Sequence, residues 1–126
     1  MKRFSRMMMV ACLVGVTGFA AAASADECGK KGQKPCPLQG WMENNVQAPM
    51  EKGEMAKVAA ALEKVASIAP DKKWNEGDEG WPAIAKAGVA AAKAGDEKAL
   101  KKSCKSCHKA FRKEYKAKHR MAPPPK

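Results

Sequence analysis

The most restrictive feature of this chain is a Cys-x-x-Cys-His sequence near its C-terminus, formed by Cys104, Cys107 and His108. The surrounding residues 97–116 carry apolar side chains at steps of three and four, which predicts an amphipathic helix. Positions three and four apart lie on the same face of a helix, so the two thiols and the imidazole share the apolar face. Whatever these three side chains hold must therefore lie inside the fold.

A Cys-x-x-Cys-His sequence is typical of the attachment site of a c-type haem. The two thiols add across the two vinyl groups of the haem, and the histidine that follows ligates the iron from the same side. We therefore predict one covalent, iron-containing haem c, with Cys104 and Cys107 as anchors and His108 as an axial ligand.

Two other uses of a Cys-x-x-Cys pair are weaker interpretations of this sequence. A thioredoxin-like redox pair requires a β-α-β setting, and no stretch of the chain has the alternation of a strand. A zinc site requires further ligands, and the remaining candidates in the exported chain have unsuitable spacing: Cys28, Cys36 and His119. The haem interpretation also agrees with the N-terminal sequence, which predicts export.

The first 25 residues have the pattern of a secretory signal peptide. A basic start is followed by an apolar run from Met7 to about Ala23 and by a small-residue cleavage sequence that ends at Ala25. We expect cleavage after Ala25 and a periplasmic protein. A membrane anchor is the alternative, but a run of about 17 residues is at the short limit for a spanning helix. A lipoprotein signal ending at Cys12 has a poor recognition sequence, and we expect no transmembrane segment in the mature chain, residues 26–126.

Export also bears on the use of the other cysteines. The chain has five cysteines, and removal of Cys12 with the signal peptide leaves four. An even number in an oxidising compartment suggests that every sulfur is used. Cys28 and Cys36 lie in a turn-rich leader, residues 26–37, and we expect a disulfide between them rather than a metal site or a thiol redox pair.

The chain is strongly basic, with a formal net charge of +11, and loss of three basic residues with the signal peptide leaves +8. Such a charge suits nucleic acid, an acidic membrane or an acidic protein. Export argues against nucleic acid, which leaves a membrane surface or an acidic redox partner. Lysine and arginine are concentrated in residues 98–120, around the expected haem. A charge run of this kind is either a solvated face or a rim that steers an acidic partner.

Four amphipathic helices account for most of the mature chain. Apolar stripes begin near Leu38, run from Val58 to Ala69, begin again at Trp81, and recur over residues 97–116. Short connections between such helices predict an all-α, antiparallel four-helix bundle over residues 38–118. Residues 119–126 form a Pro-rich tail that cannot stay helical.

Local signals predict where these helices begin and end. Pro49 should end or kink the first helix, because proline lacks the N–H of the helical hydrogen bond. Pro82 suits the first position of the third helix. Gly95 suits the residue after that helix, and Asp96 suits the N-cap of the fourth helix.

A Cys-x-x-Cys-His sequence on the last helix of an all-α chain resembles the class II c-type cytochromes, the cytochrome c-prime family of four-helix bundles. Residues 104–113 are similar to the family ending C-K-x-C-H-x-x-aromatic-R-K, and residues 50–54 and 80–100 resemble its first inter-helix loop and its third helix. The resemblance covers about residues 38–118. The leader cysteines and the absence of an arginine early in the first helix depart from the family pattern.

The resemblance implies two kinds of protein, distinguished by the sixth ligand of the iron. Members with a first-helix methionine on the iron transfer electrons, whereas members with an open distal site bind small gases. Met42 lies on the apolar stripe of the first helix, and we expect it to ligate the iron. Core packing is the other role open to Met42. Weaker ligand candidates are Met50, Met55, Met121 and His119.

Two further site candidates follow the histidine on the same helix. The resemblance implies that Arg112, one turn after His108, lies near a haem propionate, and arginine suits a carboxylate. An ordinary solvated charge is the alternative for Arg112. We expect Phe111 to pack against the porphyrin or in the core.

These features predict a periplasmic monohaem electron carrier that meets an acidic redox partner protein. A gas-binding protein for nitric oxide or carbon monoxide, with an open distal site, is the alternative. We do not expect an enzyme such as a peroxidase, because it needs distal acid–base groups and the mature chain has only His108 and His119. The resemblance also allows a homodimer.

Overall fold

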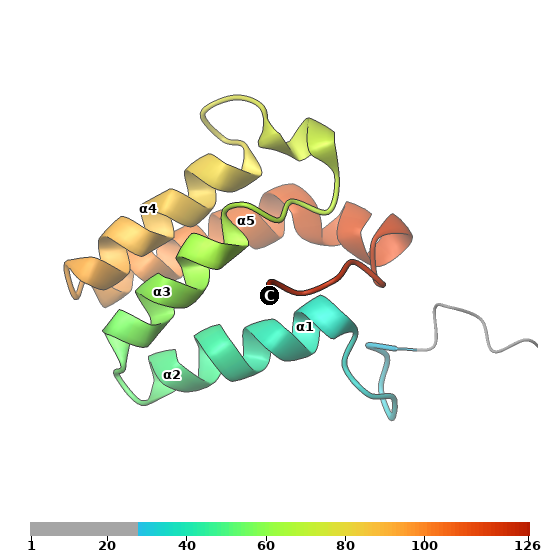
Figure 1. Cartoon of the computed structure of the whole chain (residues 1–126), viewed down its shortest axis with the longest axis horizontal. Helices are drawn as coiled ribbons and strands as arrows, with labels where there is room; N and C mark the ends of the chain where they lie inside the picture. Colours follow the sequence, from blue (N-terminus) through green and yellow to red (C-terminus); the bar gives the residue numbers. More distant parts are fainter. Residues whose placement is uncertain (1–27) are drawn as a thin grey trace, which may run out of the picture.

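The computed structural model describes residues 28–126, so the predicted signal peptide, residues 1–25, lies outside the described residues. Residues 28–126 form helices, turns and loops and contain no strand, which confirms the all-α expectation (Figure 1). The helical elements are α1 (Pro37–Met42), η1 (Glu43–Gln47, a π-helical turn), α2 (Ala48–Glu51), α3 (Met55–Val65), η2 (Lys72–Asn75, a 3₁₀ turn), α4 (Trp81–Lys93) and α5 (Glu97–Lys118).

The first three elements follow one another without a break and form one helical segment, residues 37–51. Pro49 was expected to end or kink this helix, and an end at Pro49 is wrong, because helical structure continues to Glu51. In η1 the N–H of Ala48 donates to the carbonyl of Glu43, five residues earlier rather than four. This π-helical turn ends at Gln47, two residues before Pro49, and lets the chain pass the proline.

The predicted limits of α4 and the predicted start of α5 are confirmed, whereas α3 ends at Val65 and not at Ala69. Pro82 lies in the first turn of α4, where its missing N–H has no partner to lose. Gly95 follows α4 with φ of +68°, a left-handed conformation that glycine adopts without strain. The carboxylate of Asp96 accepts a hydrogen bond of 2.9 Å from the N–H of Ala99 and caps α5.

Each helical segment packs against the next one along the chain (Figure 1). The segment of residues 37–51 contacts α3, α3 contacts α4, and α4 contacts α5. Within residues 28–126, the segment of residues 37–51 and α5 make no close backbone contact with each other. These two elements therefore leave room between them for side chains and for a bound group.

The core has two parts. One part joins α3, α4 and the start of α5 through Val58, Leu62 and Leu100. The other part is aromatic, with the ring of Phe111 4.9 Å from Trp74 and 5.5 Å from Trp81. No polar or charged residue within residues 28–126 is buried.

Trp74 is a core residue that the sequence did not indicate. It lies in η2, between the apolar stripe that was expected to end at Ala69 and the one that was expected to begin at Trp81. Its side chain is buried, and its indole N–H donates to Glu114 at 3.2 Å. A single tryptophan in a polar stretch has no periodicity, so only the fold shows that this loop covers Phe111.

The disulfide between Cys28 and Cys36 is present, with sulfur atoms 2.08 Å apart, as predicted. Arg120, just beyond α5, donates to the carbonyl of Cys28 at 2.9 Å. The tail continues without helical structure, as expected, and its last carbonyl accepts from Lys64 of α3 at 3.3 Å. No helix in the described residues is long and apolar enough to cross a membrane.

Replacing both leader cysteines, Cys28→Ser with Cys36→Ser, should lower the free energy of unfolding by about 2–3 kcal/mol. A crosslink over this short loop removes conformations mainly from the unfolded chain. Urea unfolding of the two proteins, followed by circular dichroism, measures the difference. Free thiols at both positions in oxidised protein from the periplasm, found by mass spectrometry, would contradict the pairing.

Candidate functional site

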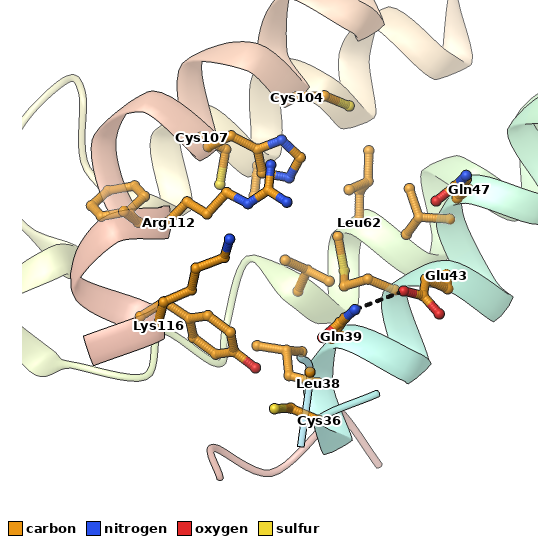
Figure 2. A pocket seen from close by; sticks show the side chains of 18 of the residues that line it. Cys36, Leu38, Gln39, Glu43, Gln47, Leu62, Cys104, Cys107, Arg112 and Lys116 are labelled. Carbon is orange, nitrogen blue, oxygen red and sulfur yellow. Dashed lines mark hydrogen bonds between the residues drawn. The ribbon is translucent and has the colours of Figure 1, made fainter. Parts of the chain in front are cut away.

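A cavity of about 730 Å³ lies between the segment of residues 37–51 and α5 (Figure 2). Its volume is within the range of small-molecule and cofactor sites. The cavity brings together all of the predicted site residues, which come from the segment of residues 37–51 and from α5. They are Met42, Cys104, Cys107, His108, Phe111 and Arg112.

One wall is the face of α5 that carries both thiols. Cys104 and Cys107 are free and partly buried. Burial raises the pKa of the Cys104 thiol, and burial together with the neighbouring Cys104 raises the pKa of Cys107 to about 11. Reactive redox cysteines have a lowered thiol pKa, so this pair is poorly suited to disulfide exchange. Its position on a cavity wall suits covalent attachment instead.

His108 lines the cavity one residue after the second thiol. Burial lowers the pKa of His108, and the positive charge of Arg112 one turn later lowers it further. Both effects favour the neutral imidazole, which is the form that binds a metal. The residue type, the position and the electrostatics of His108 therefore fit an iron ligand.

The opposite wall contains two thioethers. Along it, pairs of one apolar and one polar residue line the cavity: Leu38/Gln39, Met42/Glu43, Val46/Gln47 and Met50/Glu51. Met42 is partly buried and contacts both parts of the core. Val46 and Met50 follow it along the same wall. Among the described lining residues from positions 37–51, methionine supplies the only side chains of the kind that ligate haem iron. The donor set of the two walls therefore fits a haem with a histidine and a methionine ligand.

Phe111 and Arg112 have different environments on the same helix. Phe111 is buried among the aromatic rings of the core, which is one of its two expected positions, and it also forms part of the cavity wall. Arg112 is exposed, and Figure 2 shows it extending from α5 into the cavity beside Lys116. Neither cation has an ion-pair partner within the described residues.

This end of the cavity is basic and includes cations that were not predicted as site residues. Lys30 and Lys31 of the leader and Arg120 after α5 line it together with Arg112 and Lys116. A cluster of cations suits carboxylate groups on a bound molecule. The contact of Arg120 with the carbonyl of Cys28 joins the leader to the residues after α5, and no local pattern could have indicated a contact between residues so far apart in the sequence.

The weaker ligand candidates divide between the cavity and the rest of the fold. Met50 lines the cavity, whereas Met55, His119 and Met121 do not. The ring of His119 packs 5.1 Å from Trp74, and the sulfur of Met121 lies 3.9 Å from that of Cys28. The tail is therefore tied to the outside of the core and does not bring a ligand to the cavity.

His119 also lies in a group of possible metal donors with Asp71 and Glu114. Lys73 already binds Glu114 at 2.7 Å, and its hydrogen bond, with that of Trp74, lowers the pKa of Glu114 to about 2. Both carboxylate oxygens of Glu114 have protein partners, Lys73 on one and Trp74 on the other. This group is therefore an ion-pair cluster that fastens η2 to α5.

The chemical character of the cavity follows from the residues that line it. It has two thiols and a neutral imidazole on one wall, a thioether on the other, and cations at one end. Comparison of the chain with models of protein families, with curated proteins and with solved structures found no match.

Proposed function

We propose that this protein is a periplasmic monohaem c-type cytochrome that carries electrons. The observation that carries the proposal is the cavity with Cys104, Cys107 and His108 on one wall and Met42 on the other. When bound, the haem supplies an iron that changes reversibly between two oxidation states. The thiols of Cys104 and Cys107 would hold it covalently, and the imidazole of His108 and the thioether of Met42 would bind the iron.

Two filled axial positions suit electron transfer for a physical reason. Histidine and methionine together raise the reduction potential, and a filled sixth position leaves no place for an external gas. The apolar wall of Leu38, Val46 and Leu62 would keep water from the iron. Rearrangement on oxidation or reduction would then be small, because the same ligands stay bound in both states.

The proposal includes an antiparallel four-helix bundle of the class II type, with the haem on its last helix. Three pairs of successive helical segments are in contact, and the connections before α3 and α5 are short. The haem would fill the space between α5 and the segment of residues 37–51, which have no close backbone contact. A bound haem would thus supply the contacts that close the bundle.

Optical spectra of the purified protein test the proposal against the gas-binding alternative. We expect a low-spin ferric protein with the far-red sulfur-to-iron band and a ferrous form that takes up carbon monoxide poorly. A high-spin ferric protein whose ferrous form binds carbon monoxide readily would support the alternative, in which Met42 only packs in the core.

The proposed partner is an acidic redox protein that docks on one face of α5. Helical spacing places an unbroken row of cations on this face: Lys98, Lys102, Lys105, Lys109, Arg112, Lys113 and Lys116. Within the described residues, the α5 lysines that have ion-pair partners are Lys101 and Lys118, which lie outside the row. Arg112 and Lys116 also line the cavity, so a partner on this row would meet the edge of the haem.

Electron transfer from a reduced, small acidic flavoprotein should slow as salt concentration rises, because salt screens exposed charges beyond about 8 Å at physiological ionic strength. At low salt, the triple variant Lys105→Glu, Lys109→Glu, Lys113→Glu should react about tenfold or more slowly, since steering of this kind raises association rates by about 10–10³. Stopped-flow absorbance measures both effects.

The matched control changes the same number of charges on α3 and α4: Lys57→Glu, Lys86→Glu and Lys93→Glu. It should react nearly as fast as the unmodified protein, because its net charge equals that of the test variant but the row is intact. Equal slowing by both variants would show that net charge, and not this face of α5, governs the rate.

A further inference from the structure

Residues 37–51 form one wall of the cavity, and the spacing of their cavity-lining residues is not one that a regular α-helix places on a single face. These lining residues occur in neighbouring pairs that recur every four residues, at positions 38/39, 42/43, 46/47 and 50/51. In an α-helix, side chains four residues apart are rotated from each other by about 40°. Three such steps would add up to about 120° and would turn the last pair away from the cavity.

The π-helical turn η1 lies in the middle of this wall and removes the rotation. Its hydrogen bonds span five residues, as in the bond from the N–H of Ala48 to the carbonyl of Glu43. The turn therefore contains one more residue than an α-helical turn. As a result, lining residues four positions apart lie on the same face of the segment. Met42, Val46 and Met50 consequently all line the cavity.

Pro49 explains why the π-helical turn forms at this point. It has no N–H to donate to the carbonyl of Asn45, and in a regular α-helix its ring would clash with that carbonyl. The side-chain amide of Asn45 donates to the carbonyl of Trp41 at 2.9 Å and places a further donor within the turn. Pro49 is buried and does not line the cavity, so any effect it has on the site passes through the backbone.

Both ends of this helical segment are fixed to the rest of the fold, so neither end can rotate freely to compensate for a change in the π-helical turn. The Cys28–Cys36 disulfide lies directly before Pro37, and a short connection through Gly53 joins the other end to α3. Converting η1 to a regular α-helical turn would therefore rotate one half of the wall against the other. Met42 and Met50 would no longer lie on the same face.

We infer that Pro49 is a positioning residue that, through η1, directs the thioether of Met42 into the cavity. Which residues of positions 37–51 face the cavity depends only on the chain itself. Only the role of Met42 as an iron ligand rests on the proposed function. The turn also has a structural effect that does not depend on iron: it keeps Leu38, Met42, Val46 and Met50 on the face that lines the cavity.

The test is the variant Pro49→Ala, studied in the haem-loaded protein. Its crystal structure should show the N–H of residue 48 bonded to the carbonyl of residue 44, as in an α-helix. The far-red sulfur-to-iron band should be lost and carbon monoxide should bind the ferrous form. The matched control is Pro82→Ala at the start of α4, which is the same substitution away from the cavity and should keep the band.

A second variant separates register from stability. Deleting the exposed residue Asn44 in the Pro49→Ala background changes the wall spacing from 38, 42, 46 and 50 to 38, 42, 45 and 49. A regular α-helix keeps these positions on one face, within about 60° of one another. The double variant should therefore regain the far-red band and exclude carbon monoxide again.

Retention of both the band and the exclusion of carbon monoxide by Pro49→Ala would overturn the inference. Failure of the double variant to regain the band would also overturn it, because the loss in Pro49→Ala would then come from lower stability. Absence of the band in the unmodified protein would instead refute the proposed ligand role of Met42. The crystal structure of Pro49→Ala would still decide whether the proline sets the register.

Discussion

Haem should stay with the polypeptide in a denaturing gel when the protein is produced with a c-type maturation system. The double variant Cys104→Ala, Cys107→Ala should lose all of this gel-stable haem, because the thioether bonds are the only covalent link. Haem-dependent peroxidase staining of the gel detects the difference. Both thiols line the same cavity as His108, so the proposed attachment needs no change in the backbone of α5.

The other cysteine pair gives a matched control for this experiment. Cys28→Ser with Cys36→Ser removes the disulfide but leaves both proposed anchors, so its haem should stay attached. The single variant Cys104→Ala should also keep its haem through one remaining bond. Haem that extracts from the unmodified protein into acidified organic solvent would refute the covalent assignment.

The variant Met42→Ala should convert the low-spin ferric protein to a high-spin one. Loss of the thioether leaves the sixth position of the iron open, so the ferrous form should then bind carbon monoxide. The reduction potential should fall, because methionine ligation raises it. Optical spectra, carbon monoxide titration and potentiometry measure these three changes.

Met50→Ala provides the comparison, because Met50 lies on the same cavity wall. It removes an equal volume of side chain from that wall and should leave the iron low-spin. If Met50→Ala opened the iron to carbon monoxide and Met42→Ala did not, Met50 would be the ligand. If neither variant changed the spin state, methionine ligation would be excluded and the electron-carrier proposal would lose its main support.

Local interactions are the part of this protein that the sequence by itself determined. Pro82 and Asp96 begin helices, Gly95 ends one, and the structure contains each of these features. The Cys28–Cys36 disulfide also closes a short loop. Such features depend on residues within about two helical turns, so they can be predicted from nearby positions in the sequence.

The residues of the candidate site could be predicted where they share one face of a predicted helix. The spacing of Cys104, Cys107 and His108 requires one face of a helix, and α5 has that face on the cavity. Met42 was chosen from an apolar stripe on a separate helix, and it lines the opposite wall of the same cavity. Its ligation of iron remains a prediction.

Only the tertiary structure decided the outcome at Pro49. Proline was expected to end or kink the first helix, but the chain continues through a π-helical turn to Glu51. A local rule states what proline removes from a helix and not how the surrounding chain responds. Here the segment packs against α3, and burial of its apolar face is available only if the helix continues.

The tertiary structure also decided where Trp74 lies and which cations surround the cavity. Trp74 is buried against Phe111, 37 positions away, and Lys30 reaches the cavity together with Arg120 from the other end of the chain. Contacts of this kind join residues that are far apart in the sequence and that no repeat or periodic spacing connects. Their free energy comes from burial and charge in three dimensions, which exist only after the helices have packed.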